Sequence, residues 1–80
     1  MKKIALFDLD GTIVEYGEKI DDEMIMILLN VKKLGYELGL VSERKIDGIF
    51  LQLRNFIFSH IFSECGSVYH KYNGNNYKEL

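Results

Sequence analysis

A chain of 80 residues, of which 48% are hydrophobic and 28% are charged, has the composition of one small globular domain and not that of a disordered segment. The net charge of −2 is mild, and no basic stripe that would bind nucleic acid is present. The basic residues form isolated pairs, which are expected at solvated ends of helices or strands (Lys2-Lys3, Lys32-Lys33 and Arg44-Lys45). The single cysteine, Cys65, excludes an internal disulfide and favours a reducing, cytoplasmic location.

The first half of the chain predicts a strand, a helix and a second strand. Residues 3–7 form an apolar run that ends at acidic residues, which is typical of a buried parallel strand with its carboxyl end at Asp8. This run is too short for a signal-peptide core or a membrane span, so no membrane association is expected. Asp21 can cap a helix that has lysines in its last turn and stops at Gly35, and residues 36–41 form the second strand-like run.

The second half predicts a helix and further strands. Ser42 ends the second strand and can open a helix with one apolar face (Ile46, Ile49, Phe50 and Leu53). Residues 57–62 form a third strand or its approach, and residues 68–72 a fourth, before a hairpin turn at Asn73-Gly74. The order β-α-β-α-β-β predicts an α/β fold in which three parallel strands are flanked by two helices and joined by right-handed crossovers, with a C-terminal hairpin strand added.

The segment Phe7-Asp8-Leu9-Asp10-Gly11-Thr12 carries the strongest chemical signal in the sequence. Its two aspartates leave the predicted strand at its carboxyl end, where open α/β sheets bind ligands, and Gly11 permits an immediate turn. One carboxylate could attack a phosphoryl group beside the other, while Mg²⁺ held by carboxylate, carbonyl and water oxygens would offset their charge repulsion. The alternative is an ordinary polar turn, although the full string after an apolar strand is more specific than an isolated Asp-x-Asp.

Hydroxyl groups near the two aspartates complete the candidate phosphate site. Thr12 offers a hydroxyl and an amide to phosphate oxygens, directly after the turn at Gly11. Ser42, at the tip of the neighbouring strand, could bond a phosphate oxygen, cap the following helix, or do both. The predicted phosphate-binding residues are therefore Gly11, Thr12 and Ser42.

The sequence resembles the haloacid dehalogenase superfamily and, within it, the eukaryotic-type phosphomannomutases. The resemblance spans residue 4 to about residue 71 and rests on four short segments (residues 6–12, 19–24, 39–42 and 61–68). It implies a Rossmann-like core in which Asp8 becomes a phosphoaspartate and Asp10 is the general acid/base. It also implies that Mg²⁺ binds Asp8 and the Asp10 backbone carbonyl, and that Ser42 binds phosphate. The implied reaction is an isomerase reaction that interconverts mannose 6-phosphate and mannose 1-phosphate through a bisphosphate.

The sequence departs from that family at several positions. Gly17 stands where the flap arginine of these mutases is expected, Leu40-Val41 replaces a Gly-Gly pair, and Cys65 replaces an asparagine. The resemblance also implies a sugar-binding cap domain and a returning segment with a lysine and further acidic metal ligands. We expect residues 1–80 to be a single, truncated core domain without these parts. A phosphorylated sugar would then be bound only if the missing segments are supplied, and catalysis by the isolated chain should be weak or absent.

The first strand leads to a second functional hypothesis. In the family this strand is central, but without the later strands residues 3–7 would form an exposed sheet edge that invites pairing. We therefore expect a homo-oligomer or a partner chain at this edge. On this hypothesis the chain is a non-catalytic remnant that acts as a binding or assembly module.

The remaining candidates for chemistry are weaker. Cys65 is more simply a bystander thiol than a nucleophile. His60 and His70 lack partners at zinc-ligand spacing, so ordinary histidines are expected. The tyrosines between residues 69 and 77 are better explained by packing than by a contact surface.

Overall fold

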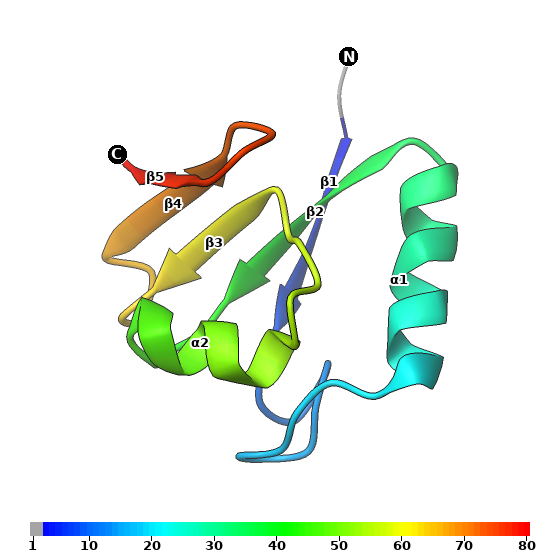
Figure 1. Ribbon diagram of the computed structural model, residues 1–80, viewed down its shortest axis with the longest axis horizontal. Coiled ribbons are helices and arrows are strands. Elements are labelled where there is room, and N and C mark those ends of the chain that lie inside the picture. The colour runs from blue at the N-terminus through cyan, green and yellow to red at the C-terminus, as the bar shows by residue number, and fades with distance from the viewer. Residues whose placement is uncertain (1–2) are drawn as a thin grey trace.

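The computed structural model describes residues 3–80, so Met1 and Lys2, the first lysine of the Lys2-Lys3 pair, lie outside it. Along the chain, strands and helices alternate before a final run of strands (Figure 1): β1 (Lys3–Asp8), α1 (Asp22–Lys33), β2 (Tyr36–Val41), α2 (Ile46–Leu53), β3 (His60–Ser63), β4 (Val68–Tyr72) and β5 (Tyr77–Glu79). The five strands form one sheet in the order β1-β2-β3-β4-β5. The first three are parallel, and β4 and β5 add antiparallel to β3, which confirms the predicted α/β fold with its hairpin.

Helix α1 begins and ends where the sequence predicts. The Asp21 side chain accepts a hydrogen bond from the amide of Met24 at 2.8 Å, which satisfies one of the free amides of the first turn. At the other end Gly35 takes a φ of +97°, a conformation that favours glycine, and its amide bonds back to Lys32. Neither α1 nor α2, the helices found in residues 3–80, is long and apolar enough to cross a membrane.

Helix α2 corrects one prediction. Its N-cap position is Lys45, without a side-chain cap bond, so the prediction that Ser42 caps this helix is wrong. The amide of Ser42 instead donates to the Phe62 carbonyl at 2.9 Å, which continues the pairing of β2 with β3. The Ser42 hydroxyl accepts from the Arg44 amide at 3.0 Å. A short turn therefore separates β2 from the helix.

Strand β3 begins at His60, so residues 57–59 are the approach to the strand. This approach contacts β5: the Tyr77 hydroxyl donates to the Phe58 carbonyl at 2.7 Å and accepts from the Phe58 amide at 3.1 Å. Both backbone groups of Phe58 are thereby satisfied outside the sheet. Burial raises the pKa of Tyr77 to about 12.

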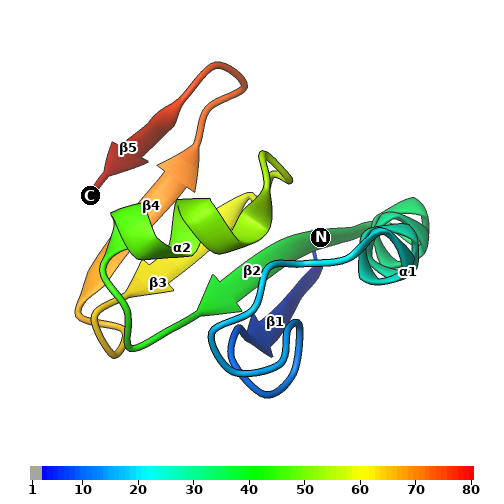
Figure 2. The ribbon, with the colours of Figure 1, turned by 60° about the horizontal axis from the view of Figure 1, so that its bottom comes forward.

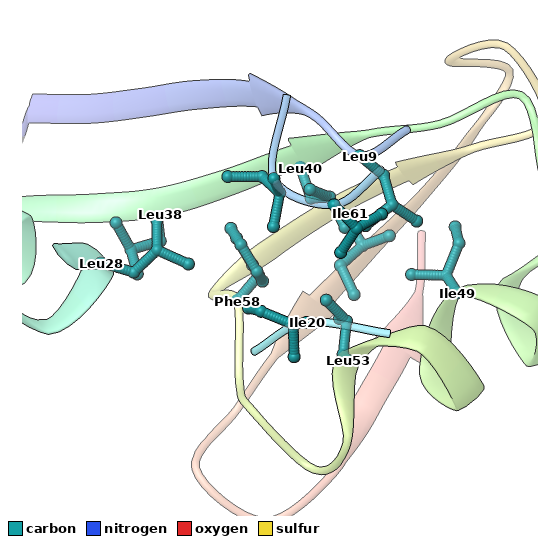
Figure 3. Close-up of a cluster of buried hydrophobic side chains, with 11 residues drawn as sticks. Leu9, Ile20, Leu28, Leu38, Leu40, Ile49, Leu53, Phe58 and Ile61 are labelled. Atoms are coloured by element: carbon teal, nitrogen blue, oxygen red, sulfur yellow. The ribbon is translucent and has the colours of Figure 1, made fainter. Parts of the chain in front are cut away.

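The hydrophobic core lies between the sheet and the two helices. Figure 3 shows Leu28 of α1 beside Leu38 of β2, and Ile49 and Leu53 of α2 facing side chains from the sheet and from the loop after β1. The fully buried residues of this cluster are Leu9, Ile20, Leu28, Leu38, Leu40, Ile49, Leu53, Phe58 and Ile61. Both helices therefore cover the same face of the sheet, as Figure 2 also shows.

Strand β1 is an edge strand within the described chain, as predicted, since it pairs only with β2. Ile4 and Leu6 point away from the core and are 54% and 56% exposed. Leu6 lies across Gly39 of β2, where an added Cβ atom would come within 2.8 Å of the Leu6 Cδ1 atom. A side chain at position 39 would therefore require the exposed Leu6 side chain to shift.

Candidate functional site

The two aspartates sit where the parallel strands β1 and β2 end. Asp8 is the last residue of β1 and pairs with Val41, the last residue of β2. The next residue, Leu9, is buried in the core and donates its amide to the Val41 carbonyl at 3.1 Å. Because Leu9 is anchored in this way, the chain presents Asp8 and Asp10 on either side of it at the mouth of the sheet.

A tight turn follows the second aspartate. The Gly11 amide donates to the Val14 carbonyl at 2.7 Å, and the Thr12 amide donates to the Leu9 carbonyl at 3.4 Å. Gly11 has a φ of +87°, which explains the need for glycine. The Thr12 amide, which was predicted to bind phosphate, and the Gly11 amide are thus engaged within the turn.

Three of the predicted site residues line one cleft of about 350 Å³, namely Asp8, Asp10 and Ser42. Tyr16, Glu43 and Cys65 complete its polar lining. Gly11 and Thr12 line a separate hollow beside the start of α1, so the structure does not bring them into the cleft of the two aspartates. Their phosphate-binding role stays a prediction.

The two carboxylates differ sharply in their surroundings. Within residues 3–80 no side chain or amide donates to the Asp8 carboxylate, so its oxygens remain open. The Asp10 carboxylate accepts at both oxygens: from Arg44 Nε at 2.8 Å and Nη2 at 3.3 Å, from Gln52 Nε2 at 3.1 Å, and from the Gly17 amide at 2.9 Å. Asp8 is therefore available for chemistry, and Asp10 is held in place.

These bonds fasten the loop after β1 to the rest of the fold. Gln52, a buried residue of α2, donates to Asp10 and also to the Glu18 carbonyl at 2.9 Å. The Gly17 amide is bound by the same carboxylate, so residues 10–18 are tied down at several points. Gly17, which stands in place of the expected flap arginine, contributes a backbone contact with a φ of +78°.

Arg44 is a site residue that the sequence pattern did not indicate, since the Arg44-Lys45 pair was interpreted as a solvated element end. The structure corrects this: the guanidinium pairs with Asp10 and lies over the Tyr16 ring, 5.3 Å from its centroid. The available signal was its position two residues after Ser42, in a turn that follows a strand of the site. Nothing in the local pattern indicated its partner, because Asp10 lies 34 residues away.

The ion pair has a measurable consequence for acid stability. The hydrogen bond from Arg44, helped by Gly17 and Gln52 and opposed by burial, lowers the pKa of Asp10 from 3.8 to about 2. As the pH falls through this window the unfolded chain takes up the proton first, so the stabilisation present above about pH 4 is progressively lost. Arg44→Gln should flatten this part of the curve of unfolding free energy against pH, measured by urea denaturation between about pH 2 and pH 5. Equal slopes in both proteins would contradict the assignment, and Asp47→Asn, at an exposed carboxylate, is the matched control.

The donors at the cleft fit a magnesium ion in part. The open Asp8 carboxylate and the backbone carbonyl of Asp10 are hard oxygen ligands, and Mg²⁺ is commonly bound by one or two protein groups together with waters and phosphate oxygens. In residues 3–80 no group of three His, Cys, Asp or Glu side chains is arranged to hold a metal. A metal at Asp8 would therefore depend on oxygen ligands from water or substrate.

The two histidines, Cys65 and the tyrosines make contacts within the fold. Buried His60 bonds Tyr69 and Glu37, each at 2.6 Å, and His70 bonds Ser63 at 3.1 Å. Cys65 is an exposed thiol at the cleft, and its amide donates to the Ser42 carbonyl at 3.1 Å. The tyrosines of β4 and β5 pack on neighbouring rings.

Comparison with known proteins adds two findings. A family model for haloacid dehalogenase-like hydrolases matches residues 5–79. A phosphomannomutase from Babesia bovis is 35% identical over 70 residues, which cover 84% of this chain and 28% of that protein. The chain thus spans a little over a quarter of the length of the curated relative that it matches.

Proposed function

Because this chain belongs to the haloacid dehalogenase-like hydrolase family, we propose that it supplies the nucleophile of a phosphotransferase site, with Asp8 as the residue that is phosphorylated. One observation carries the proposal. Asp8 stands at the mouth of the parallel strands with an open carboxylate, whereas Asp10, two residues on, is held by four hydrogen bonds. An unengaged carboxylate at the carboxyl end of a pair of parallel strands is suited to attack a bound group.

The reaction follows from these positions. An Asp8 oxygen attacks phosphorus, the bond from phosphorus to the leaving oxygen breaks, and the electron pair departs with that oxygen, which leaves an acyl phosphate on Asp8. Ser42 lines the same cleft, and although its oxygen accepts from the Arg44 amide, its hydroxyl proton remains for a phosphate oxygen. When bound at Asp8 and the Asp10 carbonyl, Mg²⁺ supplies positive charge that offsets the repulsion between carboxylate and phosphate.

The finer substrate is a phosphorylated sugar. The proposal that mannose 6-phosphate and mannose 1-phosphate are interconverted is supported by the likeness to the Babesia bovis phosphomannomutase, and it concerns the whole length of such a protein. For the isolated chain we propose incompetence in that isomerase reaction. It is supported by the hydrogen bonds that the Gly17 amide and Gln52 donate to Asp10, since a general acid must exchange its proton freely. A reducing, cytoplasmic setting is proposed from the free, exposed thiol of Cys65.

The test is formation of a phosphoaspartate analogue. Beryllofluoride should form a magnesium-dependent adduct, seen as a bound signal by ¹⁹F NMR, and acetyl phosphate should label the chain with phosphate at Asp8. Circular dichroism in the same samples establishes that the chain is folded. A folded chain that gives neither product in the presence of Mg²⁺ would overturn the proposal.

A second candidate function, assembly through the edge of the sheet, is favoured by the exposure of Ile4 and Leu6 on β1. The backbone groups of an edge strand can pair with another strand, and apolar side chains beside them add buried area. We propose that a second copy of the chain or a partner chain adds at this edge. Such a role requires no catalysis.

The edge proposal predicts association that one substitution removes. Size-exclusion chromatography with light scattering should show a dimer or larger species whose population rises with concentration. Leu6→Lys should return the chain to a monomer, because a charged head at the edge opposes strand pairing. Leu51→Lys, at a residue that is 71% exposed on α2, should leave the association unchanged. A folded wild-type monomer at every accessible concentration would contradict the proposal of assembly at this edge.

A further inference from the structure

We propose that Arg44 is a phosphate-binding residue that pairs with Asp10 in the absence of phosphate, and that a bound phosphate dianion draws the guanidinium away from Asp10. The inference deepens the proposed phosphotransferase function and rests on it. The observation behind it is that the Arg44 side chain, in contact with two residues of the cleft lining, is committed to a carboxylate.

The geometry of the pair is one that phosphate can take over. Arg44 uses Nε and Nη2 toward the two oxygens of Asp10, at 2.8 and 3.3 Å. This forked arrangement of donors matches two oxygens of a phosphate as well as those of a carboxylate. The third guanidinium nitrogen, Nη1, forms no hydrogen bond within residues 3–80, so a donor is already free.

The pair is asymmetric in a way that favours movement of the arginine. The Arg44 side chain is 32% exposed, whereas that of Asp10 is 10% exposed. After Arg44 leaves, Asp10 still accepts from the Gly17 amide and from Gln52, so the carboxylate is not left without partners. Losing the arginine therefore costs less than breaking a pair whose members have no other bonds.

The anchor of Arg44 keeps it close to the cleft during such an exchange. Its amide donates to the Ser42 hydroxyl at 3.0 Å, and Ser42 lines the cleft. The Tyr16 ring lies under the guanidinium and also lines the cleft, so it offers a surface along which the side chain can reorient. The backbone stays fixed while the side chain changes partner.

Charge supplies the driving force. Three carboxylates line the cleft, on Asp8, Asp10 and Glu43, and a phosphate dianion would enter among them. Such a site needs a cation that can follow the phosphate, and the Arg44 side chain is a cation in contact with its lining. The exchange moves an existing charge by a side-chain rotation and requires no proton transfer.

The direct test uses the full ¹⁵N-labelled chain and inorganic phosphate as the probe. The Nε–Hε signal of Arg44 should shift on titration with phosphate, while that of Arg54, which bonds Asp22 and the Ile20 carbonyl, should not. Arg44→Gln should weaken phosphate binding at least about tenfold, as expected when a charged bidentate contact is lost. Arg54→Gln is the matched control and should leave the affinity unchanged.

A double-mutant cycle separates exchange from simple removal of charge. Asp10→Asn frees Arg44 and should tighten phosphate binding about tenfold, and this gain should vanish in the Asp10→Asn, Arg44→Gln double variant. If the gain persists in the double variant, or if the Arg44 signal of the wild-type chain stays fixed at saturating phosphate, the inference is overturned. The wild-type signal decides between exchange and a fixed pair even if a variant fails to fold.

The two proposals fail in different ways. A beryllofluoride adduct at Asp8 with a fixed Arg44 signal would overturn the role of Arg44 and leave the phosphotransferase proposal standing. Phosphate binding that depends on Arg44, without any adduct at Asp8, would support the binding role and overturn phosphorylation of the chain.

Discussion

Asp8→Asn is expected to abolish magnesium-dependent labelling by acetyl phosphate, with a loss of about 10³-fold or more in the rate. The amide oxygen carries no negative charge, so it is a poor nucleophile for phosphorus and a weak ligand for Mg²⁺. The substitution is nearly isosteric, and within residues 3–80 the Asp8 carboxylate accepts no hydrogen bond. The free energy of unfolding should therefore change by less than about 0.5 kcal/mol.

The measurement is the initial rate of label incorporation, with urea denaturation run on the same preparations. Asp47→Asn, which neutralises an exposed carboxylate on α2, should retain the wild-type rate. Full labelling of the Asp8→Asn chain would show that another group, such as Asp10, is the nucleophile. That outcome would refute the assignment of roles to the two aspartates.

Phe58→Ala should remove most of the free energy of folding, so that a substantial fraction of the chain is unfolded at 25 °C. Phe58 is fully buried and packs edge-to-face with Phe56, with ring centroids 5.4 Å apart. Removing a buried phenyl ring costs about 3–5 kcal/mol, and the total stability expected for so small a domain is on the order of 5 kcal/mol. The loss of one ring is thus comparable with the whole free energy of folding.

Urea denaturation followed by circular dichroism measures this effect. Leu51→Ala, at an exposed position of α2, removes a large apolar side chain outside the core and should shift the free energy of unfolding by less than about 0.5 kcal/mol. A Phe58→Ala chain with a midpoint near that of the wild type would show that the space left by the ring collapses. The cluster drawn in Figure 3 would then be less tightly packed than its burial indicates.

Much of the fold could be predicted because its signals are local. The apolar run before Asp8, the cap at Asp21 and the stop at Gly35 each act within a few residues, and each places an element end correctly. The approach to β3 is bound by the hydroxyl of Tyr77 in β5, which lies 19 residues from Phe58. The role of Ser42 depends on the pairing of β2 with β3. The residues next to Phe58 and Ser42 in the sequence do not indicate either contact.

The candidate site was likewise predictable only in part. Parallel strands end at a common edge, so the meeting of Asp8, Asp10 and Ser42 follows from the order of the elements. The bonds of Arg44 and Gln52 to Asp10 could not be predicted, because they depend on side-chain directions set by tertiary packing. The separate hollow at Gly11 and Thr12 likewise depends on how the turn closes on itself.

Because of the hydrogen bonds to Asp10, the site can form only when distant parts of the chain have folded together. These bonds join positions 34 and 42 residues apart, so each bond closes a long loop. The conformational entropy lost in closing that loop must be overcome before the bond can stabilise the fold. Helix α1 can form early from neighbouring residues, but the bonds of Arg44 and Gln52 to Asp10 exist only once β1, β2 and α2 have docked. Assembly of the pocket therefore accompanies the docking of these elements and does not precede it.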